Sequence, residues 1–171
     1  MGDIIIIAAI DKNGLIGFEN RLPWPRISED FKRFKSLTIG NSVVMGRKTF
    51  QSIYEMNKKP LVDRENIVLT RNKNIFTGID GVKVMNSIDD ILEYSELIDK
   101  MFIIGGAQIY NQFLPYANKM EITRIHQGFL GDTFFPNYNE KDWSISNRID
   151  KDVYSFITYE KTKNKLKKII K

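Results

Sequence analysis

An acidic residue stands on an otherwise apolar helix face near the start of the chain. The segment Leu22–Leu37 reads LPWPRISEDFKRFKSL, and it predicts a helix that begins at Ser28, a typical N-cap. Asp30 directly precedes Phe31 and lies one turn before Phe34, so its carboxylate can enter a pocket that these rings line. A buried carboxylate is costly unless a partner bonds to it. The segment therefore predicts a binding site for a flat heterocycle with amidine-like or cationic N–H groups.

A simpler interpretation of the acid is open at this point. Glu29 and Asp30 both stand on the first turn of the expected helix, where negative side chains complement the positive end of the helix dipole. Acids are common at such positions whatever the function of the protein. The rest of the sequence has to decide between the two interpretations.

Composition narrows the chemistry that such a site can perform. The 171 residues suffice for one domain with a substantial core. Because the chain has no cysteine, disulfides, thiolate metal sites and a cysteine nucleophile are excluded. The single histidine, His126, argues against a multi-histidine metal site, and we expect it at the surface or at a sheet edge. No metal is therefore expected.

Much of the formal net charge of +5 lies at the C-terminus, where six lysines fall between Lys161 and Lys171. We expect a domain over 1–161 and a solvated basic tail over 162–171. A patch for nucleic acid or a membrane surface is the alternative, although the nearly neutral body of the chain does not favour it. The apolar run Ile4–Ile10 is too short to cross a membrane and predicts a buried strand. A cytoplasmic protein without nucleic-acid or membrane partners is the expectation.

Short apolar strands alternate with helices along the chain, which predicts parallel β-α-β units in one α/β domain. The last two strands have no helix between them and favour an antiparallel hairpin at one edge. Ser87 is expected to cap a helix with acids in its first turn. The expected strands are Ile4–Ile10, Ser42–Met45, Glu65–Thr70, Val82–Val84, Met101–Ile104, Lys119–Ile125, Trp143–Arg148 and Tyr154–Glu160, and the expected helices are Ser28–Leu37, Lys48–Tyr54, Asp89–Glu96 and Ala107–Leu114.

Two glycine turns follow expected strands and open expected helices, one at Gly46 and one at Gly105-Gly106. Ligands of open α/β sheets bind at the carboxyl ends of the strands, and glycine lets the backbone approach a phosphate near free helix N–H groups. A single Gly-Gly turn is also consistent with an ordinary connection, and neither turn matches the G-x-G-x-x-G fingerprint. Together the turns favour a dinucleotide with an extra phosphate, because the side chains beside them include Arg47, Lys48, Thr49 and Arg71.

Taken together, these segments resemble the dihydrofolate reductase family. The likeness runs from about Ile4 to about Glu160, and its pieces occur in the family's order: Ile7–Ile10, Gly14–Gly17, Leu22–Trp24, the acidic helix, Val43–Phe50, Arg64–Leu69, Ile103–Ala107, Tyr110, Thr123 and Gly131–Pro136. The resemblance implies a mostly parallel, eight-stranded sheet with helices on both faces and the antiparallel hairpin at its C-terminal edge. It also implies that NADPH reduces 7,8-dihydrofolate to tetrahydrofolate, in support of one-carbon metabolism and thymidylate synthesis.

The resemblance implies that Asp30 bonds the amino and ring N–H groups of the pterin and that Thr123 supports this carboxylate. Trp24 would hold water beside the acid at the end of a mobile loop over Gly14–Trp24, and this water would deliver the proton. Arg64 would clamp the α-carboxylate of the folate glutamate. The implied catalytic residues are Leu22, Trp24, Asp30 and Thr123, and the implied substrate contacts are Ile7, Ala8, Asp30, Phe31, Phe34, Ile53, Leu61, Arg64, Ile104, Tyr110 and Thr123.

For NADPH, the resemblance implies contacts with both glycine turns, with the 2′-phosphate on Arg47 or Arg71. It further implies a monomer that binds antifolates such as trimethoprim. The implied cofactor contacts are Ala9, Ile16, Gly17, Gly46, Arg47, Lys48, Thr49, Leu69, Thr70, Arg71, Ile104, Gly105, Gly106, Ala107, Gln108, Ile109 and Tyr110.

The chain departs from the family's pattern at three places. The segment between Trp24 and the acid is one residue longer than in many bacterial members, which makes Glu29 a rival of Asp30. We favour Asp30, because the two phenylalanines that follow then fall at the family's pocket positions. The second turn reads Gly-Gly-Ala, which requires a negative φ at Ala107. The stretch 55–59 is unusually polar, so the loop near the folate tail is not defined.

Two other functions are alternatives. A pyrimidine reductase of riboflavin synthesis has the same fold and cofactor half, but it would lack both the Leu22–Trp24 motif followed by a helix acid and the Arg64 clamp. A non-catalytic nucleotide-binding module would explain the glycine turns and the lysines. It gives no reason for Asp30, Thr123 and Arg64 to occur in one chain.

Overall fold

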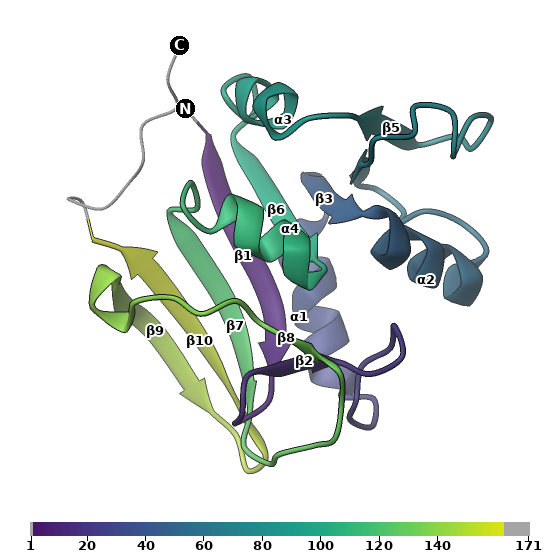
Figure 1. The fold of residues 1–171 in the computed structure, drawn as a ribbon. Coiled ribbons are helices and arrows are strands. Elements are labelled where there is room, and N and C mark those ends of the chain that lie inside the picture. The colour runs from purple at the N-terminus through teal and green to yellow at the C-terminus, as the bar shows by residue number, and fades with distance from the viewer. Residues whose placement is uncertain (1, 163–171) are drawn as a thin grey trace.

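One eight-stranded sheet forms the centre of the molecule. The structure, a computed structural model, describes residues 2–162. The strands of this sheet are β1 (Asp3–Ile10), β3 (Ser42–Gly46), β4 (Glu65–Leu69), β5 (Val82–Met85), β6 (Lys100–Gly105), β7 (Lys119–Ile125), β9 (Trp143–Asp150) and β10 (Tyr154–Lys161). Their order across the sheet is β5-β4-β3-β6-β1-β7-β10-β9 (Figure 1). All neighbours from β5 to β7 are parallel, whereas β10 is antiparallel to both β7 and β9.

Helices cover both faces of the sheet. They are α1 (Ser28–Thr38), α2 (Arg47–Asn57), α3 (Ile88–Ser95) and α4 (Ala107–Phe113). Because side chains alternate along a strand, Ile5 and Ile7 of β1 pack with apolar residues of α1 and α2, while Ile4 and Ile6 pack with those of α3 and α4. Figure 1 accordingly shows α4 in front of the sheet and α1 behind it. The buried core is therefore divided into two layers by the sheet.

The predicted elements and their order are confirmed, and most ends agree within one or two residues. Helix α2 runs three residues further than expected, to Asn57, through part of the polar stretch noted in the sequence. Sequence periodicity missed β2 (Leu15–Gly17) and β8 (Thr133–Phe134), which pair in a separate two-stranded sheet, and the short 3-10 turn η1 (Glu140–Asp142). These pieces are too short to carry a periodic pattern.

The two predicted helix caps have different outcomes. Ser87 does cap α3, because its hydroxyl accepts the N–H of Asp90 at 3.1 Å. The prediction for Ser28 is wrong: this residue is the first of α1, the N-cap is Ile27, and no side chain caps the helix. The backbone is extended at Ile27, so the helix begins at Ser28, although serine is a better capping residue than isoleucine.

Other expectations from composition can be compared with the described residues. His126 is exposed and follows β7, where its Nε2 lies 2.8 Å from the hydroxyl of Ser155, so the expected surface position is confirmed. Within residues 2–162, no helix has the length and apolar character needed to cross a membrane. The predicted tail beyond Thr162 lies outside the described residues and stays a prediction.

Candidate active site

A carboxylate from α1 and a hydroxyl from β7 meet on the α1 side of the sheet. The Oγ1 of Thr123 donates to Oδ1 of Asp30 over 2.5 Å. Thr123 is 2% exposed, and it lies next to Ala9 of β1 in the sheet register. Ala9 and Thr123 stand in the carboxyl-terminal halves of β1 and β7. Ligands of parallel sheets bind at this end of the strands.

The surroundings of Asp30 act on its pKa in opposite directions. Burial raises the pKa of Asp30 and is the largest influence, while the hydrogen bond from Thr123 and the positive charge of Arg33 lower it. The net shift is upward. A ligand that donates N–H groups to this carboxylate would therefore stabilise the charged form, which burial disfavours.

Glu29, the rival acid, faces a different part of the molecule. Its Oε2 accepts the hydroxyl proton of Tyr154 at 2.6 Å and lies 3.8 Å from the Lys151 ammonium. These partners hold the pKa of Glu29 below its ordinary value, and the bond to Glu29 raises the pKa of Tyr154 to about 12. Glu29 is exposed, whereas Asp30 is half-buried. The structure thus brings Asp30, and not Glu29, to Thr123.

The loop before α1 supplies one wall beside the acid. Trp24 is 6% exposed and packs edge-on against Phe129, with ring centroids 6.0 Å apart. The same cluster contains Phe156 and Ala9, which flank Thr123 in the sheet register. By contrast, Leu22 is 45% exposed, so the structure does not bring its side chain into this wall.

Apolar residues predicted as pocket walls gather on the α1 and α2 side of the sheet. One cluster holds Ile7, Phe34, Ile53, Leu61 and Ile104. Phe31 is half-buried outside this cluster, and the Arg26 guanidinium carbon lies 4.1 Å from its ring centroid.

Two other predicted substrate contacts, Ala8 and Tyr110, have side chains in the core on the opposite face of the sheet. Ala8 would therefore have to contact a substrate through its main chain. The Tyr110 hydroxyl donates to the carbonyl of Ile7 at 2.8 Å. Burial, and after it the charge of Asp30, raise the pKa of Tyr110, so this hydroxyl stays protonated. Tyr110 thus fixes the backbone of β1 next to the acid.

Arg64 is held beside the C-terminal end of α1. Its Nε donates to the carbonyl of Val62 at 2.8 Å, and its Nη1 donates to Oγ1 of Thr38 at 3.2 Å. Thr38 in turn donates to the carbonyl of Phe34 at 2.7 Å. Burial lowers the pKa of Arg64, the charge of Asp63 opposes this, and an arginine remains cationic in either case. Sequence reasoning missed Thr38, whose signal is a hydroxyl residue one turn after Phe34.

The two glycine turns lie side by side, because β3 and β6 are neighbours with Met45 paired to Gly105. Gly46 and Gly106 are the N-caps of α2 and α4, and no side chain caps either helix. A Cβ at Gly46 would stand 3.1 Å from Ile109 Cγ1, and one at Gly105, where φ is +120°, would stand 3.2 Å from the Tyr110 hydroxyl. The Gly105-Gly106 peptide is cis. Close packing against Ile109 and Tyr110 thus leaves little room for a side chain at Gly46 or Gly105.

The polar side chains predicted for the cofactor surround these turns at the surface. Arg47 and Lys48 are exposed on the first turn of α2, and Arg71 is exposed after β4. Leu69 and Thr70 are half-buried, and the carbonyl of Thr70 accepts from Asn86 at 2.8 Å. As the Gly-Gly-Ala turn requires, Ala107 is absent from the non-glycine residues with positive φ.

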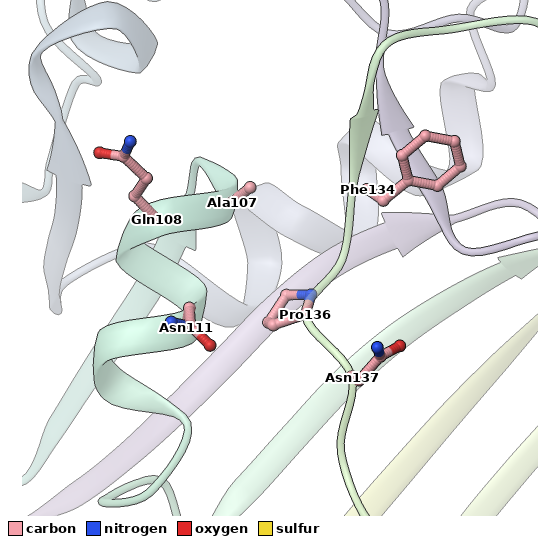
Figure 2. A pocket seen from close by; sticks show the side chains of 6 residues that line it. All are labelled: Ala107, Gln108, Asn111, Phe134, Pro136 and Asn137. Atoms are coloured by element: carbon pink, nitrogen blue, oxygen red, sulfur yellow. The ribbon is translucent and has the colours of Figure 1, made fainter.

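A hollow lies between α4 and the chain that follows β8 (Figure 2). It is lined by Ala107, Gln108, Asn111, Phe134, Pro136 and Asn137. Two of these residues, Ala107 and Gln108, belong to the predicted cofactor set. The hollow therefore continues the surface of the second glycine turn along α4.

Carboxylates that sequence reasoning missed tie the loop over Gly14–Trp24 to the segment near β8. Asp11, fully buried, accepts the N–H groups of Asn13 and Leu15 and, through its other oxygen, that of Phe129 at 2.8 Å. Asp132 accepts the N–H of Glu19 at 3.1 Å. Asp11 follows β1 directly and precedes Asn13-Gly14, a pattern typical of a turn. Its bond to Phe129, 118 residues further along the chain, cannot be predicted from the local sequence.

Together, the α/β fold, the half-buried carboxyl bonded to Thr123 and the paired glycine turns are features of an enzyme that would bind a heterocycle beside a nucleotide. Comparison with known proteins specifies the class. The family model described as dihydrofolate reductase matches residues 3–166. The chain is 40% identical over 165 residues to the dihydrofolate reductase of Bacillus subtilis (strain 168), which covers 92% of this chain and 94% of that protein. It is 42% identical over 162 residues to the one from Buchnera aphidicola subsp. Baizongia pistaciae (strain Bp), which covers 95% and 92%.

A solved structure agrees with these relatives. Dihydrofolate reductase from Enterococcus faecalis, complexed with NADP(H) and RAB-propyl, matches with a TM-score of 0.83 at 34% identity, covering 94% of this chain and 96% of that one. The chain belongs to the dihydrofolate reductase family. The predicted family, fold and enzyme class are thereby confirmed.

Proposed function

We propose that this chain reduces 7,8-dihydrofolate to tetrahydrofolate with NADPH and that Asp30 is the carboxylate that binds the pterin. Family membership over almost the whole chain and a structural relative complexed with NADP(H) support the reaction. The contact between Asp30 and Thr123 carries the assignment of the acid. It places a half-buried carboxylate next to apolar walls at the ligand-binding end of the sheet.

Asp30 can recognise a pterin through the acceptor capacity of its two oxygens. Oδ1 accepts from Thr123, which leaves Oδ2 and a lone pair of Oδ1 for the amino group and a ring N–H. Because burial disfavours the charged carboxyl, the hydrogen bonds of a bound ring would shift Asp30 towards its ionised form. Asp30 would thus orient and polarise the ring, while Ile7, Phe34 and Ile104 exclude water from it.

The residues around the glycine turns fit a dinucleotide. NADPH, when bound, supplies the hydride. Gly46, Gly105 and Gly106 would hold its pyrophosphate through main-chain N–H groups, because they stand at the N-terminal ends of α2 and α4, where helix N–H groups are free. The exposed guanidinium groups of Arg47 and Arg71 are suited to the 2′-phosphate. Ala9 and Ile16 would contact the nicotinamide end.

The chain's part in proton delivery is to admit water beside Asp30 and to exclude it elsewhere. Trp24 stands in the wall formed with Ala9 and Phe156, and it ends the loop that Asp11 and Asp132 tie to the segment near β8. We propose that movement of this loop gates the water that protonates the ring nitrogen. Hydride transfer then needs little beyond positioning of two rings in a dry pocket.

The proposal extends to inhibitors and to the state of the protein. A protonated diaminopyrimidine such as trimethoprim presents adjacent N–H donors to Asp30 and should bind in the same pocket. We also propose a monomer, because one chain supplies every residue assigned to the site. Light scattering should give a mass near 19.9 kDa, and a dimer would refute this part. The cytoplasmic location stays a prediction.

The proposed function is tested by NADPH oxidation on addition of dihydrofolate, with two neighbouring acids compared. Asp30→Asn should slow turnover severely at neutral pH and leave NADPH affinity nearly unchanged. Glu29→Gln is the matched control, because Glu29 is also a carboxylic acid, one residue away, but faces Tyr154. Its turnover should stay close to that of the unmodified protein. Unchanged turnover in Asp30→Asn would remove Asp30 from the proposed role.

A further inference from the structure

A second polar contact joins α1 to β7 directly beside the Asp30–Thr123 contact. The Nη2 of Arg33 lies 2.6 Å from Oε2 of Glu121. Arg33 follows Asp30 by three positions on α1, and Glu121 precedes Thr123 by two on β7, so each pair shares a face of its element. The helix therefore contacts the strand through two polar contacts. In one, the Asp30 carboxyl meets the uncharged hydroxyl of Thr123; the other is the ion pair between Arg33 and Glu121.

Further contacts with strand β10 hold the Arg33–Glu121 ion pair in place. Glu121 is 8% exposed, and its Oε2 also accepts the hydroxyl proton of Thr158 on β10 at 2.8 Å. The guanidinium carbon of Arg33 lies 4.8 Å from the ring centroid of Phe156, and Phe156 pairs with Thr123 in the register. Glu121, Thr158 and Phe156 thus hold the guanidinium in one position.

That position keeps the arginine near Asp30 without an ion pair between them. Among the described residues, the ion pair of Arg33 is with Glu121, and none within 4.0 Å joins it to Asp30. Without Glu121, the same side chain would be free to turn to Asp30, the α1 carboxyl whose pKa its positive charge lowers. An arginine paired with Asp30 would occupy the oxygens that a pterin needs.

We propose that Glu121 is a positioning residue for the reaction, because it holds Arg33 away from Asp30 and leaves the Asp30 carboxylate available to the substrate. The inference rests on the proposed role of Asp30. It adds a residue on β7, two positions from Thr123, that touches neither substrate nor cofactor. Glu121 also offsets part of the positive charge of Arg33, so the pair attracts the Asp30 carboxylate less than a lone guanidinium would.

Other groups near Asp30 do not provide this function. On its own helix, Glu29 is engaged by Tyr154 and Lys151. Tyr110 from α4 and Tyr154 from β10 have raised pKa values and are uncharged at neutral pH. Thr123 from β7 is a neutral hydrogen-bond donor. Among these neighbours, Arg33 is therefore the charged group that acts on Asp30, and Glu121 is the partner that holds it.

The test changes one charge at a time and follows the titration of the Asp30 carboxyl by ¹³C NMR in the ligand-free protein, assigned with Asp30→Asn. Glu121→Gln leaves Arg33 uncompensated, which should move the titration midpoint down by about one pH unit. Arg33→Met leaves the charge of Glu121, which should move it up by a similar amount. The double variant restores neutrality and should return the midpoint close to its original value.

Substrate affinity gives a second readout. In Glu121→Gln, KM for dihydrofolate should rise about tenfold, and KM for NADPH should stay unchanged. Glu160→Gln is the matched control, because it breaks the 4.0 Å pair with Lys119 on the same two strands, further from Asp30. It should move neither readout.

A midpoint that stays fixed in Glu121→Gln, or moves equally in Glu160→Gln, would overturn the inference. If Arg33→Met does not fold, the comparison of these two glutamine variants still decides. The proposed function fails separately, because it is refuted when Asp30→Asn retains turnover, whatever Glu121 does.

Discussion

Replacing Arg64 with leucine should weaken binding of dihydrofolate far more than binding of a pterin that lacks the glutamate. The guanidinium has five N–H donors, and the structure engages two of them, one with Val62 and one with Thr38. The remaining donors can bond a carboxylate in bidentate fashion. Because Arg64 is already held in place and half-buried, a ligand does not have to order it.

The expected size of this loss follows from the bonds removed. A hydrogen-bonded charge pair that is partly desolvated contributes about 2–3 kcal/mol. This corresponds to a loss of about 30- to 140-fold in affinity for the complete ligand. For the fragment without glutamate, the same substitution should change affinity by less than about twofold.

Calorimetric titration of both ligands into both proteins measures the difference. Arg148→Leu is a suitable control, because Arg148 is an exposed arginine on β9 that pairs with Asp150. It should affect neither ligand. Equal losses for the two ligands in Arg64→Leu would refute the clamp, and so would an unchanged affinity for dihydrofolate.

Three further outcomes are expected. Because burial raises the pKa of Asp30 in the folded protein, the stability linked to this carboxyl is present at acidic pH and is lost as pH rises through the folded-state pKa. Ligand-free Asp30→Asn should therefore melt above the unmodified protein at pH 7, with a difference that shrinks on acidification, and a lower melting temperature at pH 7 would contradict this. Thr123→Val removes a bond that lowers the pKa of Asp30, so the ¹³C titration should move to higher pH, and a downward shift would be inconsistent with the geometry. Gly105→Ala should lower the free energy of unfolding, measured by chemical denaturation, by about 1–3 kcal/mol, since φ is +120° and the new Cβ would stand 3.2 Å from the Tyr110 hydroxyl. Gly40→Ala is the control and should lower it less, because φ is +75° there and the new Cβ would have nothing within 4 Å.

The order of the long elements could be predicted because each carries its own periodic pattern. The run Ile4–Ile10, for example, alternates between two buried layers and therefore reads as a continuous apolar strand. The pairing of β2 with β8 could not be predicted, since two or three residues carry no period. The first residue of α1 agrees with the prediction, but the N-cap is Ile27 and not Ser28, because the helix is not capped by a side chain.

The site shows the same division between local and distant information. Asp30 could be chosen over Glu29 from the family resemblance, which places Phe31 and Phe34 at the family's pocket positions. The contacts that decide its environment come from residues far along the chain, namely Thr123 and, through Arg33, Glu121. No sequence pattern links Arg33 of α1 to Glu121 of β7, so this ion pair was not predicted. The balance between burial and hydrogen bonding at Asp30 likewise needed the fold.

The central claim is that Asp30 receives the N–H donors of the bound heterocycle. The most direct test is a crystal structure of the protein with NADPH and trimethoprim. The account predicts that the amino and ring N–H groups of the diaminopyrimidine lie within hydrogen-bond distance of both Asp30 oxygens, with Glu29 still on Tyr154. A ligand bonded to Glu29, or one seated in the pocket without contact to Asp30, would contradict it.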